Sequence, residues 1–269
     1  YFSSLFTSVA GANVNDILNH IAPKVTPQMN DFLGAEYSAE EVKRALDDIG
    51  DLKAPGMDGL PALFYKHYWQ LVGDDVVNEV LQVLRGGSIP EGWNDTLVVL
   101  IPKVQNPETL KDLRPISLCN VVYKLVSKVI ANRLKCILDE IISPNQSAFV
   151  PGWLISDNTI LAYEMTYFLK RKRTGRNSYM ALKLDMSKAY DKVEWGFLEK
   201  VMIQLGFEQG FVSLINTCIR TVMYRFKING VCTDVVIPER GLRQGNPISP
   251  YLFLLCAKGL SSFLNHAEA

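Results

Sequence analysis

The chain has 269 residues, of which 48% are hydrophobic and 21% charged, and 28 basic side chains balance 28 acidic ones. This composition allows a sizeable core, and the zero net charge argues against a general polyanion binder, so any nucleic-acid contact must come from local patches. No apolar run approaches the roughly twenty residues of a membrane-spanning helix, so no membrane partner is predicted. The five cysteines are dispersed, which is typical of reduced thiols in an intracellular protein.

The first part of the chain predicts helices joined by loops. Residues 1–36 carry apolar side chains without a sustained period, which predicts a linker or a loosely attached leader. A helix is expected after Ser38, because Ser38 and Glu41 form a capping-box pattern ahead of an apolar stripe. The stretch 53–60, Lys-Ala-Pro-Gly-Met-Asp-Gly-Leu, is rich in turn residues and predicts a loop. Another amphipathic helix is expected over 74–84.

The middle of the chain predicts an extended arm that carries two cations. A short apolar strand is expected over 96–101, and residues 113–118 are expected to be extended because Arg114 precedes a proline. Lys103 and Arg114 then flank the loop of a hairpin-like arm, where they could clamp a triphosphate or simply be solvated. Asn120 is expected to cap a long helix.

The next informative stretch is 180–191, Met-Ala-Leu-Lys-Leu-Asp-Met-Ser-Lys-Ala-Tyr-Asp. Residues 180–184 alternate apolar and other side chains, which predicts a strand with Asp185 at its carboxyl end. Strand ends are where sheet-based folds place ligands, and a carboxylate is a hard oxygen ligand suited to Mg²⁺. Asp185 could instead cap a turn, as many aspartates after strands do. Tyr190 would stand nearby as a flat wall.

The last part of the chain predicts two helices, a hairpin and a glycine-containing loop. The helices are expected over 195–205 and 211–222, and the hairpin turns at Asn229-Gly230. The loop 241–250, Gly-Leu-Arg-Gln-Gly-Asn-Pro-Ile-Ser-Pro, leads into a helix amino terminus, which favours anions. Helices first, then strands and helices mixed, predict an α+β protein.

Six blocks resemble, in the family's order, the reverse transcriptase region of plant LINE-type retrotransposons, which lack long terminal repeats. The blocks are the stretches 53–59, 100–103, 113–135, 146–150, 183–191 and 241–250. The resemblance implies a right-hand polymerase, with a fingers subdomain over 37–178, a partial palm over 179–269 and no thumb.

The resemblance also implies an RNA-directed DNA polymerase that copies its own RNA at a nicked chromosomal target. An RNA template, a DNA primer or target, deoxynucleoside triphosphates (dNTPs) and two Mg²⁺ ions are therefore expected, and the nucleus is the implied location. Asp185 would be the first catalytic aspartate and a ligand of both metal ions, with the backbone carbonyl of Met186 as a further ligand. Five residues would bind the incoming dNTP: Lys103, Arg114, Tyr190, Gln244 and Gly245.

The chain departs from the family in one main respect. The family carries a second metal-binding pair, Tyr- or Phe-Ala-Asp-Asp, after the glycine loop, and no Asp-Asp follows Gly245 here. The chain also begins with Tyr1 rather than Met. We therefore expect a fragment of a longer protein that is inactive alone, because each Mg²⁺ prefers about six oxygen ligands. The family usually has Asp where Asn246 stands, Arg where Trp153 stands and Glu where Lys258 stands, and these three substitutions suggest a decaying copy.

Two other interpretations are left open by the sequence. The chain could be a non-catalytic nucleic-acid-binding remnant, or it could resemble a group II intron maturase, which shares several blocks. The residues Cys119-Asn120 and Ala131-Asn-Arg-Leu-Lys135 favour the LINE-type family over the maturase. The sequence indicates no particular oligomeric state.

Overall fold

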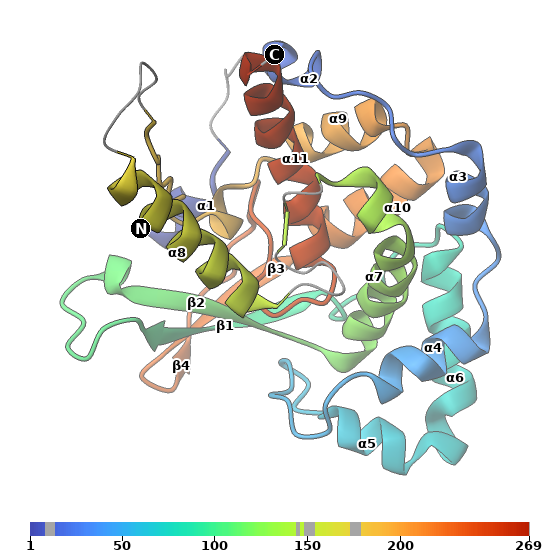
Figure 1. Cartoon of the computed structure of the whole chain (residues 1–269). Coiled ribbons are helices and arrows are strands. Elements are labelled where there is room, and N and C mark those ends of the chain that lie inside the picture. The colour runs from blue at the N-terminus through green and yellow to red at the C-terminus, as the bar shows by residue number, and fades with distance from the viewer. Residues whose placement is uncertain (9–13, 144–145, 148–153, 173–178, 269) are drawn as a thin grey trace.

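The structure is a computed structural model and describes residues 1–8, 14–143, 146–147, 154–172 and 179–268. Helices pack beside a small four-stranded sheet, which confirms the predicted α+β class (Figure 1). The helices are α1 (Phe2–Phe6), α2 (Asn15–Leu18), α3 (Pro27–Gly34), α4 (Ala39–Asp47), α5 (Ala62–His67), α6 (Trp69–Leu84), α7 (Val121–Ile141), α8 (Ile155–Arg171), α9 (Trp195–Leu205), α10 (Gln209–Arg220) and α11 (Ser249–Glu268). Across these described ranges, no helix is both long and apolar enough to cross a membrane.

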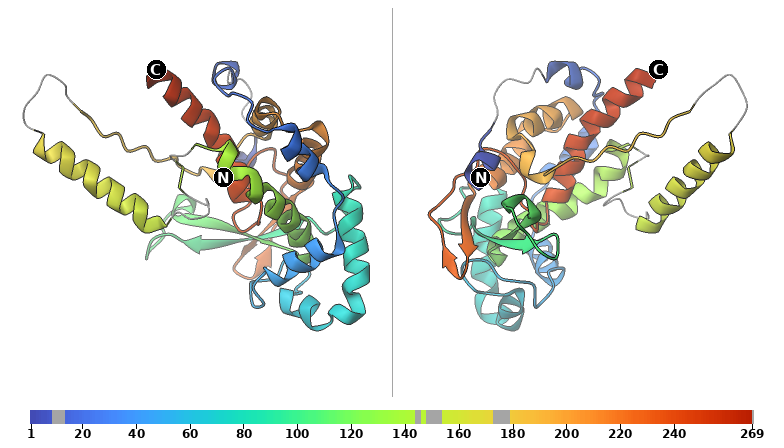
Figure 2. Two further views of the ribbon diagram at one scale, coloured as in Figure 1. Left: turned by 45° about the vertical axis from the view of Figure 1, so that its right-hand side comes forward. Right: turned by 90° about the vertical axis from the view of Figure 1, so that its left-hand side faces the viewer.

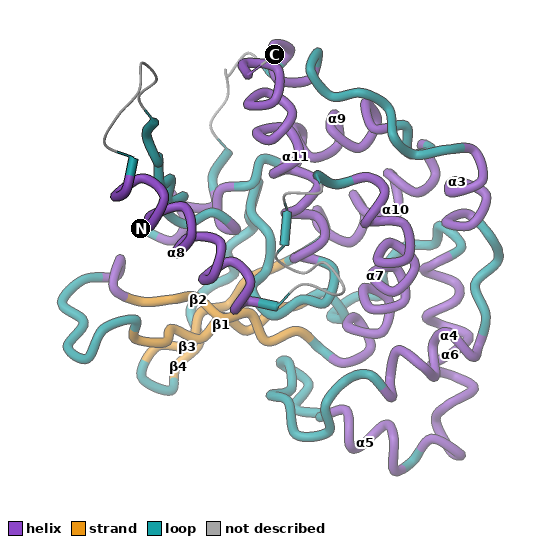
Figure 3. The backbone as a smooth tube through the Cα atoms, in the orientation of Figure 1, coloured by secondary structure: helices purple, strands orange, loops and turns teal. Residues whose placement is uncertain are grey.

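The sheet has the strand order β2-β1-β3-β4 (Figure 3) and contains both parallel and antiparallel pairs. Its strands are β1 (Asp95–Pro102), β2 (Leu113–Cys119), β3 (Met223–Ile228) and β4 (Val231–Cys232). The β1–β2 and β3–β4 pairs are antiparallel, as predicted for the arm and the hairpin, whereas β1 and β3 are parallel. The hairpin turns at Asn229 and Gly230, whose φ angles of 50° and 85° suit a tight hairpin turn.

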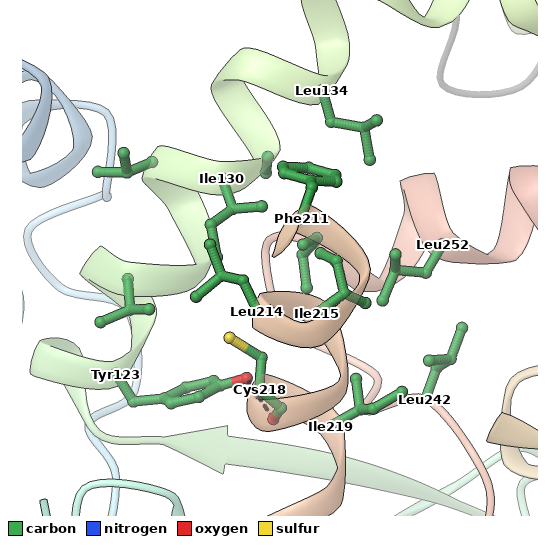
Figure 4. Packing of buried hydrophobic residues seen from close by; sticks show 14 of the residues in the cluster. Tyr123, Ile130, Leu134, Phe211, Leu214, Ile215, Cys218, Ile219, Leu242 and Leu252 are labelled. Atoms are coloured by element: carbon green, nitrogen blue, oxygen red, sulfur yellow. Dashed lines mark hydrogen bonds between the residues drawn. The ribbon is translucent and has the colours of Figure 1, made fainter. Parts of the chain in front are cut away.

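The core lies around α7, which is buried along most of its length. Side chains of α7 and α10 face one another across this core, with Leu252 of α11 beside them (Figure 4). The labelled α7 residues are Tyr123, Ile130 and Leu134, and those of α10 are Phe211, Leu214, Ile215, Cys218 and Ile219. Apolar burial of this kind is the main favourable term in folding, so α7 and α10 form the frame to which the site segments attach.

The helix predicted after Ser38 is confirmed as α4, with the Ser38–Glu41 capping box in place. The long helix after Asn120 is confirmed as α7, but the Asn120 side chain makes no capping hydrogen bond. Its amide instead accepts a hydrogen bond from the backbone of Asp58 (3.3 Å) and donates one to the Gly92 carbonyl (2.9 Å). A Cβ atom at Gly56 would lie 2.0 Å from that amide oxygen, so only glycine fits there. The 53–60 loop is thereby fixed to the start of α7.

The described parts of the first 36 residues, 1–8 and 14–36, pack against the body, unlike the linker or loosely attached leader that the sequence predicted. Phe2 and Phe6 of α1 are buried, and Phe2 stacks on Phe226 of β3 with 4.8 Å between ring centroids. Ile21 and Leu33 are each 1% exposed. The apolar side chains of this part of the chain are too widely spaced in the sequence to show a helical period. The folded chain nevertheless buries them against other elements.

The strand predicted over 180–184 is absent from the described sheet, and this prediction is wrong. Residues 180–186 are extended but pair with no described strand. The side chains of Met180, Leu182 and Leu184 are 84%, 71% and 62% exposed. This segment stands away from the body together with α8, and the two touch where Tyr179 meets Phe168 (Figure 2). The alternation of side chains is present, but the neighbouring strand that would make it a sheet is not.

Candidate functional site

Residues from four separate segments line a cavity of about 420 Å³. The segments are the β1–β2 arm, the turn before residue 191, the glycine loop and the start of α11. The lining residues are Lys103, Arg114, Pro115, Lys188, Ala189, Tyr190, Asp191, Arg243, Gln244, Gly245 and Pro250. All five residues predicted to bind a dNTP are thus brought together. Asp185 and Met186 are not among the lining residues.

The β1–β2 arm places two of the cations. Arg114 on β2 pairs with Ile101 on β1 in the antiparallel register. Lys103 lies at the start of the loop that joins these two strands, so both cations stand at the same end of the arm. The backbone N–H of Lys103 donates to the Asp112 carbonyl at 2.8 Å, which closes that loop. Both side chains are exposed and can reach a ligand in the cavity. The hairpin-like arm predicted from the sequence is therefore confirmed.

The glycine loop is held between β2 and the segment after Tyr190. The N–H of Leu242 donates to the Tyr190 carbonyl at 2.8 Å, and the N–H of Ser117 donates to the Gln244 carbonyl at 2.9 Å. Gly245 has a φ of 111°, and a Cβ atom there would lie 2.9 Å from the Ser117 carbonyl oxygen. Both facts require glycine, and together they bring the loop close to β2.

Tyr190 forms a flat wall of the cavity. Its ring stacks on Phe253 of α11, with 4.9 Å between centroids and 13° between planes. Burial raises the pKa of its hydroxyl, so the side chain is neutral at physiological pH. A rigid ring held from behind can exclude a substituent on a bound ligand by its volume alone.

Lys188 is a further cation of the cavity, beside Lys103, Arg114 and the buried Arg243, and the sequence did not predict a role for it. Its Nζ atom donates to the Leu113 carbonyl at 3.2 Å. Burial is the largest cause that lowers the pKa of Lys188, and the charges of Lys103 and Arg114 lower it further. None of these four cations forms an ion pair with a described residue. The cavity therefore gathers several positive charges that no described carboxylate pairs with directly.

Asp191 is an acidic residue of the same cavity, and the sequence analysis missed it too. Its side chain is 2% exposed, and its Oδ2 atom has no hydrogen-bond partner. Burial raises its pKa from the ordinary 3.8, although the nearby charges of Lys188 and Lys103 oppose the shift. Lys188 and Asp191 both lie in the stretch 183–191, which resembles a motif of the family. The sequence predicted side-chain roles only for Asp185 and Tyr190 of that stretch.

Replacing Asp191 with asparagine is expected to raise the free energy of unfolding at pH 7 by about 1 kcal/mol. Because the folded-state pKa is raised, ionising this carboxyl costs stability as the pH climbs above 3.8. The advantage of the variant should vanish below that pH and become complete above the raised pKa. Urea unfolding between pH 3.5 and 7 measures it. Asp75→Asn, on the exposed side of α6, is the control, and a pH-independent difference would contradict the prediction.

The predicted metal ligands stand apart from the cavity. Asp185 is an exposed carboxylate on the extended segment, and Met186 lines a different, apolar cavity with Phe197 and Phe253. Within the described ranges, no three His, Cys, Asp or Glu side chains gather as a metal site. One carboxylate and one carbonyl are hard oxygen donors, but they do not make up a site for two Mg²⁺ ions.

The α+β fold thus holds one cavity that combines cationic side chains with an aromatic wall. Residues 101–268 match the family model described as reverse transcriptase (RNA-dependent DNA polymerase), and the chain belongs to that family. The parallel β1–β3 pair and the cavity both fall within or next to the matched residues.

Individual relatives come from mobile elements and from a plant. The chain is 33% identical over 233 residues to a Transposon TX1 uncharacterized 149 kDa protein of Xenopus laevis, covering 87% of this chain and 18% of the relative. It is 26% identical over 242 residues to a Pol polyprotein from type-2 retrotransposable element R2DM of Drosophila melanogaster, covering 87% and 22%. It is 54% identical over 43 residues to an uncharacterized mitochondrial protein of Arabidopsis thaliana, covering 16% and 35%. The chain spans about a fifth of the first two relatives.

Proposed function

We propose that this chain is the reverse transcriptase domain of a LINE-type retrotransposon, an RNA-directed DNA polymerase from an element without long terminal repeats. The family match supports the activity, and the names of the transposon TX1 and R2DM relatives support the kind of element. They also favour this interpretation over the maturase-like alternative. The short match to the Arabidopsis protein supports a plant origin.

The observation that carries the proposal is the convergence of Lys103, Arg114, Tyr190, Gln244 and Gly245 on one cavity. In the proposed function, the planar guanidinium of Arg114 and the ammonium of Lys103 hold the triphosphate of a dNTP. The Tyr190 ring excludes the 2′-hydroxyl of a ribonucleotide by its volume. Gln244 and Gly245 line the space for the nascent base pair and the template.

The proposed partners and subdomains follow from the same family. An RNA template and a DNA primer or target would bind between a fingers subdomain over 37–178 and a palm over 179–269. Residues 1–36 would belong to the packed body, because α1 and α3 contribute to its core. We place the protein inside the cell, in the nucleus, where the chromosomal target lies.

Magnesium is the metal we propose for the complete polymerase. Asp185 and the Met186 carbonyl would supply two of its oxygen ligands, and the remainder would come from the family's Asp-Asp pair, the substrate phosphates and water. The segment 180–186 would then have to approach the cavity that Tyr190 and Asp191 line.

The alternative of a non-catalytic remnant has one observation in its favour. Asn246, where the family usually has Asp, is buried and its Oδ1 atom has no hydrogen-bond partner. Its amide nitrogen donates to the Tyr123 hydroxyl at 3.3 Å. A buried acceptor without a partner costs stability, as expected where a substitution has not been compensated. The residues that line the cavity still match the family's motifs, so binding is expected in either case.

Thymidine triphosphate binding to the 269-residue chain, measured by isothermal titration calorimetry with Mg²⁺, tests the proposal. The double variant Lys103→Met/Arg114→Met should bind at least about tenfold more weakly, because each charge-assisted hydrogen bond contributes about 1.5–3 kcal/mol. Lys111→Met is the matched control, since Lys111 lies on the same arm but does not line the cavity. Equal affinities for the double variant and the control would contradict the proposed site.

A further inference from the structure

The backbone of Lys188 adopts a conformation that lysine rarely takes. Its φ angle is 56°, in the left-handed region. Among the described residues, the other non-glycine with a positive φ is Asn229, a residue type that suits its place in the hairpin turn. A strained residue persists only where its surroundings impose it, and such residues gather at active sites and ligand clamps. Lys188 combines this backbone conformation with a place in the lining of the cavity.

The electrostatics of the cavity give the second observation. Lys188 comes from the turn before Tyr190, whereas Lys103 and Arg114 both come from the β1–β2 arm, so two segments far apart in the sequence bring these three cations to one cavity. Like charges at close range repel one another. The one acidic lining residue, Asp191, forms no ion pair with any of the three, although its charge is felt by Lys188. A bound anion with several charges offsets this repulsion.

We propose that Lys188 binds the phosphate chain of the incoming nucleotide, as a third phosphate ligand beside Lys103 and Arg114. The inference rests on the proposed nucleotide site and adds a residue to it. The ammonium group of Lys188 donates to the Leu113 carbonyl at 3.2 Å. That carbonyl is a neutral acceptor, and a phosphate oxygen is a stronger one, so the ammonium exchanges the first for the second when a nucleotide binds.

A purely structural role for Lys188 and a role in ligand binding predict opposite effects of its removal on the melting temperature. If the lysine serves to fasten the turn to β2 through Leu113, removing it should lower the melting temperature. If it serves the ligand, Lys188→Gly removes both the backbone strain and the repulsion between cations, and the melting temperature should stay the same or rise. Stability therefore separates the two roles without any measurement of activity.

The experiment measures thymidine triphosphate and thymidine monophosphate binding to the 269-residue chain and its variants by calorimetry. Lys188→Met and Lys188→Gly should weaken triphosphate binding at least about tenfold, and monophosphate binding less. Lys188→Arg should retain most of the affinity because it keeps the charge. Lys192→Met is the matched control, since Lys192 is exposed on the same turn but does not line this cavity, and it should stay within about twofold.

Two results would overturn the inference, and they are distinguishable. If Lys188→Met binds triphosphate like the unsubstituted chain while Lys103→Met/Arg114→Met binds weakly, the nucleotide site stands and the role of Lys188 is wrong. A fall in melting temperature for Lys188→Gly without loss of affinity would have the same meaning. If the unsubstituted chain does not bind the triphosphate at all, the proposed function fails and the inference fails with it.

Discussion

Replacing Arg243 with alanine is expected to lower the free energy of unfolding by about 3–5 kcal/mol. The guanidinium group is buried, with 4% of the residue exposed, and it donates to Thr96 Oγ1 at 3.1 Å and to the Cys218 carbonyl at 3.2 Å. It also donates to the Asn94 side chain and lies 4.1 Å from the ring centroid of Tyr123. Removal would leave a cavity lined by buried acceptors that have lost their donor.

Chemical unfolding in urea measures this effect, and Arg225→Ala is the control. Arg225 is half-buried on β3, and its loss should change the free energy of unfolding by less than about 1 kcal/mol. A similar small loss for Arg243→Ala would show that its hydrogen bonds contribute nothing net. Arg243 precedes Gln244 directly, so the variant should also bind nucleotide more weakly even where it remains folded.

The contacts of Arg243 explain how the glycine loop reaches its place. The guanidinium joins the start of β1, the residue Tyr123 of α7 and the carbonyl end of α10, three elements that are far apart in the sequence. Two backbone hydrogen bonds then fix the loop on either side, at Tyr190 and Ser117. The position of Gln244 and Gly245 in the cavity is therefore set by the buried core below it.

Local signals allowed much of the fold to be predicted from the sequence. The capping box at Ser38, the proline after Arg114 and the Asn229-Gly230 turn each act over a few residues, and each predicted the element that the structure contains. The parallel pairing of β1 with β3 was not predicted, because more than a hundred residues separate the two strands. The sequence of a strand does not indicate which distant strand will be its parallel partner.

The wrongly predicted strand over 180–184 and the missed site residues have the same origin, because both depend on contacts between distant parts of the chain. The alternation at 180–184 is a local property, but a strand forms only when another strand offers its backbone hydrogen bonds, and none does so in the described structure. Among the site residues, Lys188 and Asp191 lie beside the residues that the motif marked, yet their significance comes from burial and from the other cations. Those properties appear only once the chain is folded.

The Asp185→Asn variant should separate nucleotide binding from polymerisation. In the 269-residue chain it should change thymidine triphosphate affinity by less than about twofold, because the carboxylate is exposed and does not line the cavity. Neither this variant nor the unsubstituted chain should extend a DNA primer on an RNA template with Mg²⁺. One carboxylate leaves most of the oxygen ligands of two metal ions unfilled.

In a longer protein that carries the family's Asp-Asp pair, the same substitution should reduce primer extension by at least about a thousandfold, which corresponds to about 4 kcal/mol of activation free energy. Glu199→Gln is the matched control, since Glu199 pairs with Arg220 at the surface and does not line the cavity. Primer extension by the 269-residue chain that disappears with Asp185→Asn would show that the described residues already complete the site. Extension that persists in the longer variant would mean that Asp185 only ends the extended segment, as many aspartates after strands do.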